Sequence, residues 1–210
     1  MSTNAPSRAR KWWYGLPGGR VLRAALRQLR IGIRDGELRD RLPDASIGEG
    51  VVVRGIDRLT VGKGLILDHR AYINCRGGAW NKRGGYVTIG DNSEIGPYCA
   101  LWGAGGITIG NNVHLGSHVS ISAHEGRQVK PEDVDIWKPL DFEFAPVVIE
   151  DHVLVCSGTS IAPGVRIGHH SIIGCGSAVV KDIPPYSVAA GAPARVIRSS
   201  VAPATSAITA

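Results

Sequence analysis

Histidine side chains are the groups in this sequence best suited to move a proton at neutral pH, because their ordinary pKa lies near neutrality. The chain contains seven of them, His69, His114, His118, His124, His152, His169 and His170. Six lie within stretches of regular repeat, whereas His124 directly precedes the long irregular segment 125–146. A general base at such a place accepts the proton of a weak nucleophile and contributes about 10²–10⁴-fold to a rate. We expect His124 to be this base, and the alternative is a surface or loop-anchoring histidine.

The four cysteines are Cys75, Cys99, Cys156 and Cys175. None forms a C-x-x-C pair or clusters with histidines at the spacing of metal ligands. We therefore expect no metal site, and buried or semi-buried thiols in a reducing compartment. Direct proton transfer by a histidine needs no covalent intermediate, so Cys156 and Cys175 are interpreted as structural rather than nucleophilic.

The charge of the chain is concentrated in an N-terminal arm. The formal net charge is +6, but residues 1–42 carry +7 and the remainder carries −1. A nucleic-acid-binding domain would need basic residues over its own surface, so we expect no nucleic-acid partner.

The arm has the pattern of an amphipathic helix with a basic face. Its apolar positions are Leu22, Leu26, Leu29 and Ile33, and its basic positions are Arg20, Arg23, Arg27, Arg30 and Arg34. Such a helix can contact an anionic membrane surface, or it can cap the open end of a repeat array. The chain has no apolar run long enough to span a bilayer and no apolar region typical of a secretory signal. We expect a cytoplasmic protein, and both roles of the arm, including contact with the inner face of the membrane, stay open.

Most of the chain follows a period of six residues. Aliphatic residues recur at Ile149, Val155, Ile161, Ile167, Ile173 and Val179, and earlier at Ile89, Ile95, Leu101 and Ile107, with a two-residue shift to Ile109, Leu115 and Ile121. A small residue, often glycine, follows many of them, as a tight corner requires. A short strand plus a corner fills six residues, and three such units form a triangular coil. This predicts an all-β parallel β-helix of about five or six coils. The alternative is a sandwich or barrel, whose period of two does not explain aliphatics held six apart.

Two segments interrupt the repeat, at residues 76–86 and 125–146. The repeat continues on both sides of each, so we expect both to leave the helix as excursion loops, which are often functional. The predicted organisation is a basic arm over residues 1–42, a β-helix domain over 43–198, and a disordered tail over 199–210.

Residues 149–198 closely resemble the hexapeptide-repeat acetyltransferases, in the branch of the galactoside and maltose O-acetyltransferases and their polysaccharide-modifying relatives. The most specific part is the closing sequence KDIPPYSVAAGAPARVIR, residues 181–198. A looser resemblance extends over residues 47–198. It implies a left-handed β-helix, acetyl-CoA as co-substrate without a metal, and a homotrimer whose active sites lie between adjacent subunits.

The resemblance also implies roles for individual residues. His124 matches the position of the family's general base. Ser157 would offer a backbone N–H near the thioester, and Cys175 would lie beside the pantetheine arm. Lys181, Arg195 and Arg198 match basic residues near the nucleotide end of the cofactor.

The acceptor side of the resemblance is less complete. Asn74 matches an acceptor-binding asparagine, although one extra coil separates it from His124. Apart from the resemblance, Trp102 lies next to a loop, where an aromatic side chain either stacks on a sugar ring or packs under the loop. Leu154 stands where some sugar-acetylating relatives carry a tryptophan, which leaves the acceptor class in question.

Three functions are compatible with these features. The first is O-acetylation of a saccharide hydroxyl in exopolysaccharide, capsule or lipopolysaccharide assembly. The second is N-acetylation of an amino-sugar nucleotide or of an amine-bearing xenobiotic. The third is a metal-dependent, carbonic-anhydrase-like or purely scaffolding β-helix, for which His114 and His118 are the only candidate metal-ligand pair.

Overall fold

The computed structural model describes residues 36–78, 81, 84–127 and 141–200 of the 210-residue chain. The chain divides into two compact units, Met1–Arg41 and Leu42–Ala210. In the first unit, residues 36–41 are helical. The amphipathic helix predicted over residues 20–34 lies outside the described residues.

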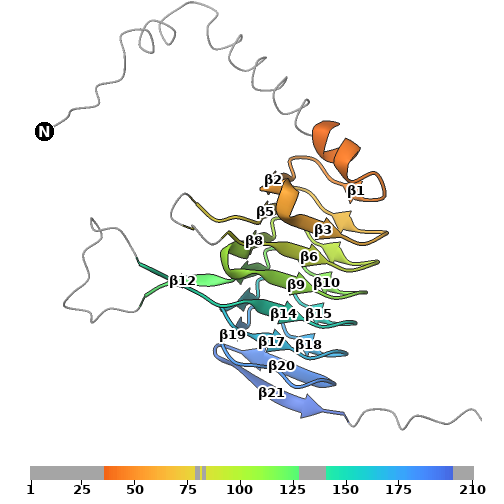
Figure 1. Cartoon of the computed structure of the whole chain (residues 1–210). Coiled ribbons are helices and arrows are strands. Elements are labelled where there is room, and N and C mark those ends of the chain that lie inside the picture. Colours follow the sequence, from red (N-terminus) through yellow and green to blue (C-terminus); the bar gives the residue numbers. More distant parts are fainter. Residues whose placement is uncertain (1–35, 79–80, 82–83, 128–140, 201–210) are drawn as a thin grey trace, which may run out of the picture. The chain divides into compact units, whose positions relative to one another are not determined.

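The second unit is a stack of triangular coils built from three parallel sheets (Figure 1). Sheet A contains β1 (Ser46–Ile47), β4 (Ile66–Leu67), β7 (Glu94–Ile95), β10 (His114–Leu115), β15 (Leu154–Val155), β18 (Ile172–Ile173) and β20 (Ser187–Gly191), with β21 (Ala194–Ser199) added antiparallel to β20. Sheet B contains β2 (Val52–Arg54), β5 (Tyr72–Asn74), β8 (Ala100–Trp102), β11 (Ser120–Ser122), β16 (Ser160–Ile161) and β19 (Ala178–Val179). Sheet C contains β3 (Leu59–Val61), β6 (Val87–Ile89), β9 (Ile107–Ile109), β14 (Val147–Ile149) and β17 (Arg166–Ile167). The fold is the parallel β-helix predicted from the repeat, with the left hand that the resemblance implies.

Aliphatic side chains of successive coils stack inside the triangle and form its core. In sheet A, Leu67, Ile95 and Leu115 pair in register and none of them is exposed to solvent. In sheet B, Ile121 lies between Leu101 and Ile161 in the same way. No single coil encloses its own aliphatic residue, so the coils stabilise one another through burial of roughly 25 cal/mol per Å² of apolar surface.

The three corners of the triangle differ in how strictly they keep the six-residue spacing. Between sheets A and B, and between sheets C and A, every inward residue is six positions from the next, as from Leu115 to Ile121 and from Ile149 to Val155. The corner between sheets B and C keeps no fixed length. Its inward pairs are Val53 and Val61, Ile73 and Ile89, Leu101 and Ile109, Ile121 and Ile149, and Ile161 and Ile167.

Short helical turns explain the smallest irregularities at the B–C corner. The 3₁₀ turns η1 (Ile56–Arg58) and η2 (Gly103–Gly105) each add two residues to a hexad. The turn η2 also explains the two-residue shift in the aliphatic pattern from Ile107 to Ile109. Both residues belong to β9 and both face inward, so the six-residue spacing resumes from Ile109.

Both longer excursions leave from this same corner. The second begins as an antiparallel pair, in which β12 (His124–Gly126) is bonded to β13 (Phe142–Phe144). This antiparallel pair projects from the coils (Figure 1), and it is called the arm below, as distinct from the basic N-terminal arm. The first excursion is tied to η2, because Asn81 Nδ2 donates to Ala104 O at 2.8 Å.

The turns at the other two corners contain left-handed residues that are not glycine. Those at the C–A corner include His152, His170 and Tyr186, with φ between 55° and 58°. Their rings stack, with centroids 4.6 Å apart for His152–His170 and 5.0 Å apart for His170–Tyr186. Tyr98 and His118 stack in the same way at the A–B corner, at 5.0 Å. A left-handed residue with a side chain costs of order 1–2 kcal/mol, and ring stacking between coils offsets part of this.

The C-terminal end of the β-helix is a hairpin rather than the start of a tail. β21 runs to Ser199, and the Ser200 N–H donates to Tyr186 O at 2.9 Å. Ser199 and Ser200, which the prediction places in a disordered tail, therefore belong to this hairpin, and residues 201–210 lie outside the described residues. Among the described residues, no helix has the length and apolar character that a membrane crossing needs.

Candidate functional site

His124 is the first residue of the arm, two residues after sheet B ends its fourth coil. Its ring packs against two aromatic rings of the returning strand, with centroids 5.6 Å from Phe142 and 6.4 Å from Phe144. Its carbonyl accepts a hydrogen bond from Ser122 Oγ at 2.5 Å. The arm therefore fixes both the backbone and the ring of the predicted base.

Burial lowers the pKa of His124 below its ordinary value, and a hydrogen bond from the ring to the backbone of Trp102 opposes this shift in part. Burial disfavours the charged imidazolium and so favours the neutral ring. A neutral imidazole donates through one nitrogen and carries a lone pair on the other. This is the protonation state that a general base requires.

Trp102 is the last residue of β8, one coil before His124, and its indole is 38% exposed. Its ring packs on Tyr72 of the preceding coil with centroids 4.9 Å apart, and the Arg54 guanidinium lies 5.8 Å from the Tyr72 ring. These residues form an aromatic surface next to the base. The sequence singled out Trp102 as an aromatic residue next to a loop, but not Tyr72, which occupies an outward position in β5.

Asn74 lies on the coil before Trp102, as β5 and β8 pair Asn74 with Trp102. It is 6% exposed, and its Oδ1 accepts the backbone N–H of Gly77 at 3.0 Å and of Arg76 at 3.3 Å. In this structure the Asn74 side chain caps the turn into the first excursion. Its predicted contact with an acceptor remains a prediction.

The residues expected to bind the cofactor do not share one corner of the helix. Ser157 and Cys175 lie on neighbouring coils at the A–B corner, where the Gly176 N–H donates to Ser157 O at 2.9 Å. Arg195 of β21 continues this line, since it pairs with Ala190 of the adjoining strand. Lys181 instead follows β19 at the B–C corner, the same corner as His124. Arg198 pairs with Val188 at the start of β20, away from the A–B end of that strand.

Ser157 has a backbone N–H that is available to a ligand. Within the described part of the chain, that N–H donates no hydrogen bond, while its hydroxyl accepts from Ser117 Oγ at 3.1 Å. Gly116 has no side chain to cover it, as a Cβ there would come within 2.8 Å of the Ser157 nitrogen. A free N–H at an exposed corner can donate to a developing oxyanion, which fits the role predicted for Ser157.

The cysteines divide into an inner and an outer pair. Cys75 and Cys99 are fully buried, and burial raises the pKa of each thiol to about 11. Cys156 is partly exposed and Cys175 is exposed, so the expectation that all four are at least semi-buried is wrong for Cys175. Its place in a two-residue turn presents its side chain outward.

The candidate metal-ligand histidines have other partners. His114 Nδ1 lies 2.9 Å from Glu94 Oε2, and His118 stacks on Tyr98. Among the described residues, no group of three or more histidine, cysteine or acidic side chains is arranged to hold a metal ion.

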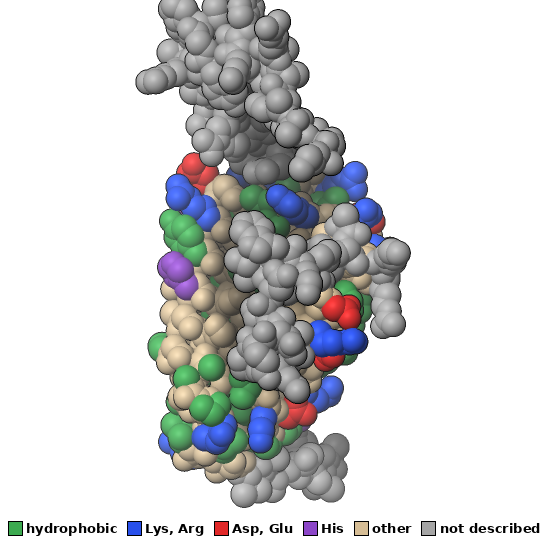
Figure 2. Space-filling view, turned by 90° about the vertical axis from the view of Figure 1, so that its left-hand side faces the viewer, with side chains coloured by type: hydrophobic (Ala, Val, Ile, Leu, Met, Phe, Trp, Pro, Cys, Tyr) green, Lys and Arg blue, Asp and Glu red, His purple; other side chains and the backbone are tan. Residues whose placement is uncertain are grey.

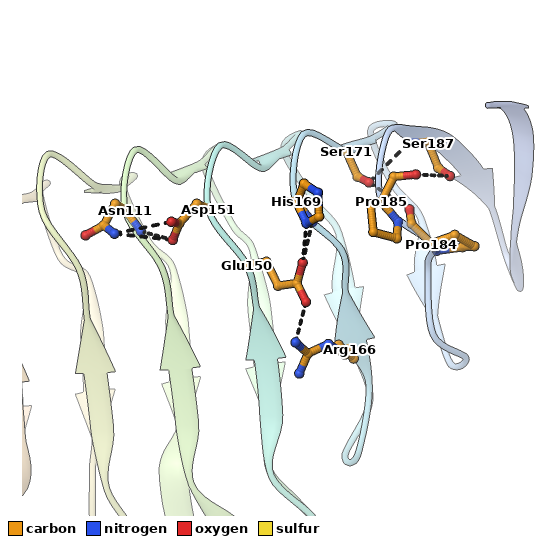
Figure 3. A network of polar contacts seen from close by, with 9 residues as sticks. All are labelled: Asn111, Glu150, Asp151, Arg166, His169, Ser171, Pro184, Pro185 and Ser187. Carbon is orange, nitrogen blue, oxygen red and sulfur yellow. Dashed lines mark hydrogen bonds and ion pairs between the residues drawn. The ribbon is translucent and has the colours of Figure 1, made fainter. Parts of the chain in front are cut away.

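A polar network lies at the C–A corner, where none of the predicted site residues is found (Figure 3). His169 Nδ1 lies 2.7 Å from Glu150 Oε2, and Arg166 pairs with the same carboxylate. The hydrogen bond from His169 is the main reason that the pKa of Glu150 is lowered. An open groove of about 440 Å³ is lined here by Thr108, Gly110, Val148, Ile149, Glu150, Asp151, His152, His169 and His170. Its carboxylates are already hydrogen-bonded, so the network reads as support for the turns of successive coils.

The side of the molecule from which the excursions leave is mostly uncharged (Figure 2). Charged side chains gather towards its two ends and along one edge. Within the antiparallel pair, Arg127 forms ion pairs with Asp141 at 3.1 Å and with Glu143 at 3.2 Å.

Comparison with known proteins agrees with this architecture. The chain is 45% identical over 92 residues to the galactoside O-acetyltransferase of Escherichia coli, which covers 44% of this chain and 43% of that protein. It is 47% identical over 53 residues to the 2,3,4,5-tetrahydropyridine-2,6-dicarboxylate N-acetyltransferase of Brevibacillus brevis, covering 25% of this chain and 22% of that protein. The chain spans about half the length of the first four curated relatives it matches, between 42% and 57% of each. No family model matches the chain.

Solved structures match about three quarters of the chain. A hexapeptide-repeat acetyltransferase from Vibrio cholerae, complexed with acetyl-CoA, has a TM-score of 0.51 and 25% identity, and the match covers 71% of this chain and 70% of that one. An N-acyltransferase from Bacillus cereus, in complex with dTDP and 3-hydroxybutyryl-CoA, has a TM-score of 0.62 at 20% identity, covering 74% and 80%. The first of these is named for the same repeat. The predicted resemblance to hexapeptide-repeat acetyltransferases is therefore confirmed, in the left-handed β-helix and in the names of the relatives.

Proposed function

We propose that this protein is an acetyl-CoA-dependent O-acetyltransferase that acts on a saccharide hydroxyl, with His124 as general base. The observation that carries the proposal is the setting of His124, an imidazole with a lowered pKa that packs against Phe142 and Phe144 beside the exposed Trp102. The similarity to a galactoside O-acetyltransferase supports the same reaction class.

The chemistry follows from these side chains and the Ser157 N–H. The lone pair of the His124 ring accepts the proton of the acceptor hydroxyl as its oxygen attacks the thioester carbonyl of acetyl-CoA. The Ser157 N–H donates to the oxyanion of the tetrahedral intermediate, a contact that typically supplies about 10²–10³-fold. The intermediate collapses to the acetyl ester, and the proton passes from the imidazolium to the departing thiolate of CoA. Trp102 and Tyr72 offer aromatic faces on which a sugar ring can pack.

The division of the site between two corners favours a homotrimer with active sites between subunits. His124 and Lys181 lie at the B–C edge of sheet B, while Ser157, Cys175 and Arg195 lie at its A–B edge. In one chain the outer surface of sheet B separates these groups. We propose that the B–C corner of one subunit faces the A–B corner of the next, which brings the base to the thioester.

We further propose a place for the enzyme in cytoplasmic assembly of a surface polysaccharide, with the basic arm of residues 1–42 at the inner face of the membrane. The motivation is the charge of the arm, +7 against −1 for the remaining chain. Co-sedimentation with vesicles of phosphatidylglycerol and phosphatidylcholine tests this, and we expect the intact chain to bind them at low salt. An intact chain that does not co-sediment with these anionic vesicles refutes the proposal.

The test of the activity is an acceptor screen in which release of the free CoA thiol is measured. We expect turnover with a saccharide acceptor, and a loss of about 10²–10⁴-fold in kcat for His124→Gln. His114→Gln is the matched control, because His114 is an exposed histidine paired with Glu94 outside this corner. Full activity in His124→Gln would show that another group is the base.

The second candidate is N-acetylation, which the 47% identity to a dicarboxylate N-acetyltransferase favours. The same base and N–H donor would serve an amine acceptor. Amino-sugar nucleotides tested beside neutral sugars distinguish the two, since an N-acetyltransferase turns over only the amine.

A further inference from the structure

The outer cysteine pair, Cys156 and Cys175, occupies one turn of two successive coils. The strands before them, β15 and β18, pair Val155 with Ile173, so Cys156 lies opposite residue 174 and Cys175 lies opposite residue 157. Backbone hydrogen bonds lie on both sides of the pair, from Cys156 N–H to Ile173 O and from Gly176 N–H to Ser157 O, each 2.9 Å long. The two cysteines are thus diagonal neighbours on adjoining coils.

This position allows a disulfide bond without unfolding the coil. A strand spacing of about 4.8 Å combined with one residue of offset, about 3.3 Å, gives a Cα separation of roughly 6 Å. Disulfides in proteins span about 4.4–6.8 Å between Cα atoms. The thiols are also within interaction range, because a hydrogen bond with Cys175 contributes to the raised pKa of Cys156, after burial.

Accessibility separates this pair from the inner one. Cys175 is exposed and Cys156 is partly exposed, whereas Cys75 and Cys99 have no exposed surface and pKa values of about 11. The thiolate is the nucleophile in exchange reactions, so a buried thiol with a pKa of about 11 reacts very slowly near pH 8. Cys99 is held further by a hydrogen bond from its Sγ to Gly116 O at 3.0 Å.

We propose that Cys156 and Cys175 form a site of reversible covalent modification by low-molecular-weight disulfides. The exposed Cys175 thiolate attacks one sulfur of the disulfide RSSR, forms a mixed disulfide and releases one thiol, RSH. The Cys156 thiolate then attacks Cys175 Sγ, releases the second RSH and closes the Cys156–Cys175 bond. Two protein thiols are oxidised, one RSSR is reduced to two RSH, and the new bond links two coils of the β-helix.

The experiment treats the full-length protein with glutathione disulfide near pH 8 and follows the free thiols and the intact mass. We expect two of the four thiols to disappear, no retained glutathione, and a peptide map that links residue 156 to residue 175. Dithiothreitol should restore all four thiols. Cys75 and Cys99, mapped in the same molecules, are the internal controls and should stay reduced.

Single variants test the order of the steps. Cys156→Ser should stop at a mixed disulfide that retains one glutathione on Cys175, and Cys175→Ser should react at least about tenfold more slowly than wild type. The proposal is overturned if wild type keeps separate glutathione adducts on both residues, if it forms only intermolecular disulfides, if neither thiol reacts, or if Cys75 or Cys99 reacts as fast.

A parallel reaction with CoA disulfide keeps this proposal separate from the proposed acetyl transfer. A rate above that with glutathione disulfide supports CoA recognition at this corner. Equal rates count against CoA recognition there and leave the linked pair in place as the expected product.

Discussion

The substitution Gly105→Ala tests whether the root of the arm positions His124. Gly105 is the last residue of η2, and a Cβ built on it would lie 2.0 Å from Ala123 O and 3.0 Å from Ala145 N. These atoms belong to the residues through which the chain enters and leaves the arm, and the Ala145 N–H donates to Ala123 O at 3.1 Å. A methyl group at Gly105 therefore presses on the bond that closes the arm.

The size of the effect follows from the overlap. Real Cβ contacts are essentially never shorter than 3.0 Å, so the carbonyl next to His124 must retreat by about 1 Å. A misplacement of about 1 Å costs on the order of 10²-fold in rate, because the base leaves its working geometry. Overpacking of this kind also lowers the free energy of unfolding by about 1–3 kcal/mol.

Two assays separate these effects, acceptor-dependent release of the CoA thiol and thermal unfolding. Gly126→Ala is the matched control on the same arm, since a Cβ at Gly126 meets nothing within 4 Å. We expect the control to keep the activity and melting temperature of wild type. If Gly105→Ala also keeps both, the root of the arm does not position the base and the argument is refuted.

Three further predictions concern the base, the core and the cofactor. Burial lowers the pKa of His124, and the active form of the base is the neutral one. As the pH falls from neutral, kcat/KM should therefore stay level and decrease only below the ordinary histidine pKa of about 6.5. A midpoint above about 7 in the pH–rate profile contradicts this. Ile121→Ala removes a fully buried side chain and should lower the free energy of unfolding in urea by about 2–5 kcal/mol, whereas Ile172→Ala, on an exposed position, should cost clearly less. Arg195→Ala should raise KM for acetyl-CoA with little change in kcat, because a contact with a phosphate of the cofactor is lost. An unchanged KM indicates that the guanidinium serves only its hydrogen bond to Ala194 O.

The repeat was predictable from the sequence because its period reflects the geometry of the coil. An inward residue every six positions, as from Ile149 to Val179, is what a triangular coil of short strands demands, and the structure confirms it. The two excursions were also predictable, since each breaks that period. Residues 76–86 and 125–146 both leave the coils where the pattern stops.

The root of the arm was not predicted, although a signal was present. Phe142, Glu143 and Phe144 alternate apolar and charged side chains, as a strand exposed on one face does. The six-residue period is the stronger signal in this sequence, and an antiparallel pair with three residues in each strand is too short to be predicted beside it. The contact of Phe142 with the His124 ring depends on this pairing.

The stacking of aromatic and histidine rings at the corners could not be predicted from one sequence. His152, His170 and Tyr186 are 18 and 16 residues apart, and only the register of the coils brings them together. Seen singly, a histidine in a repeat is a surface residue. The sequence also did not reveal that the predicted cofactor residues would lie at different corners of the triangle, because that depends on which sheet each hexad joins.

The unequal corners have a consequence for how such a chain can diversify. Two corners keep their six-residue count through every coil. The B–C corner contains two 3₁₀ turns, a short excursion and a long one, and the register on either side is unchanged. The surface at this corner can therefore change while the buried core of the coils stays the same. New segments grafted at this corner can alter what the protein recognises without altering how its coils assemble.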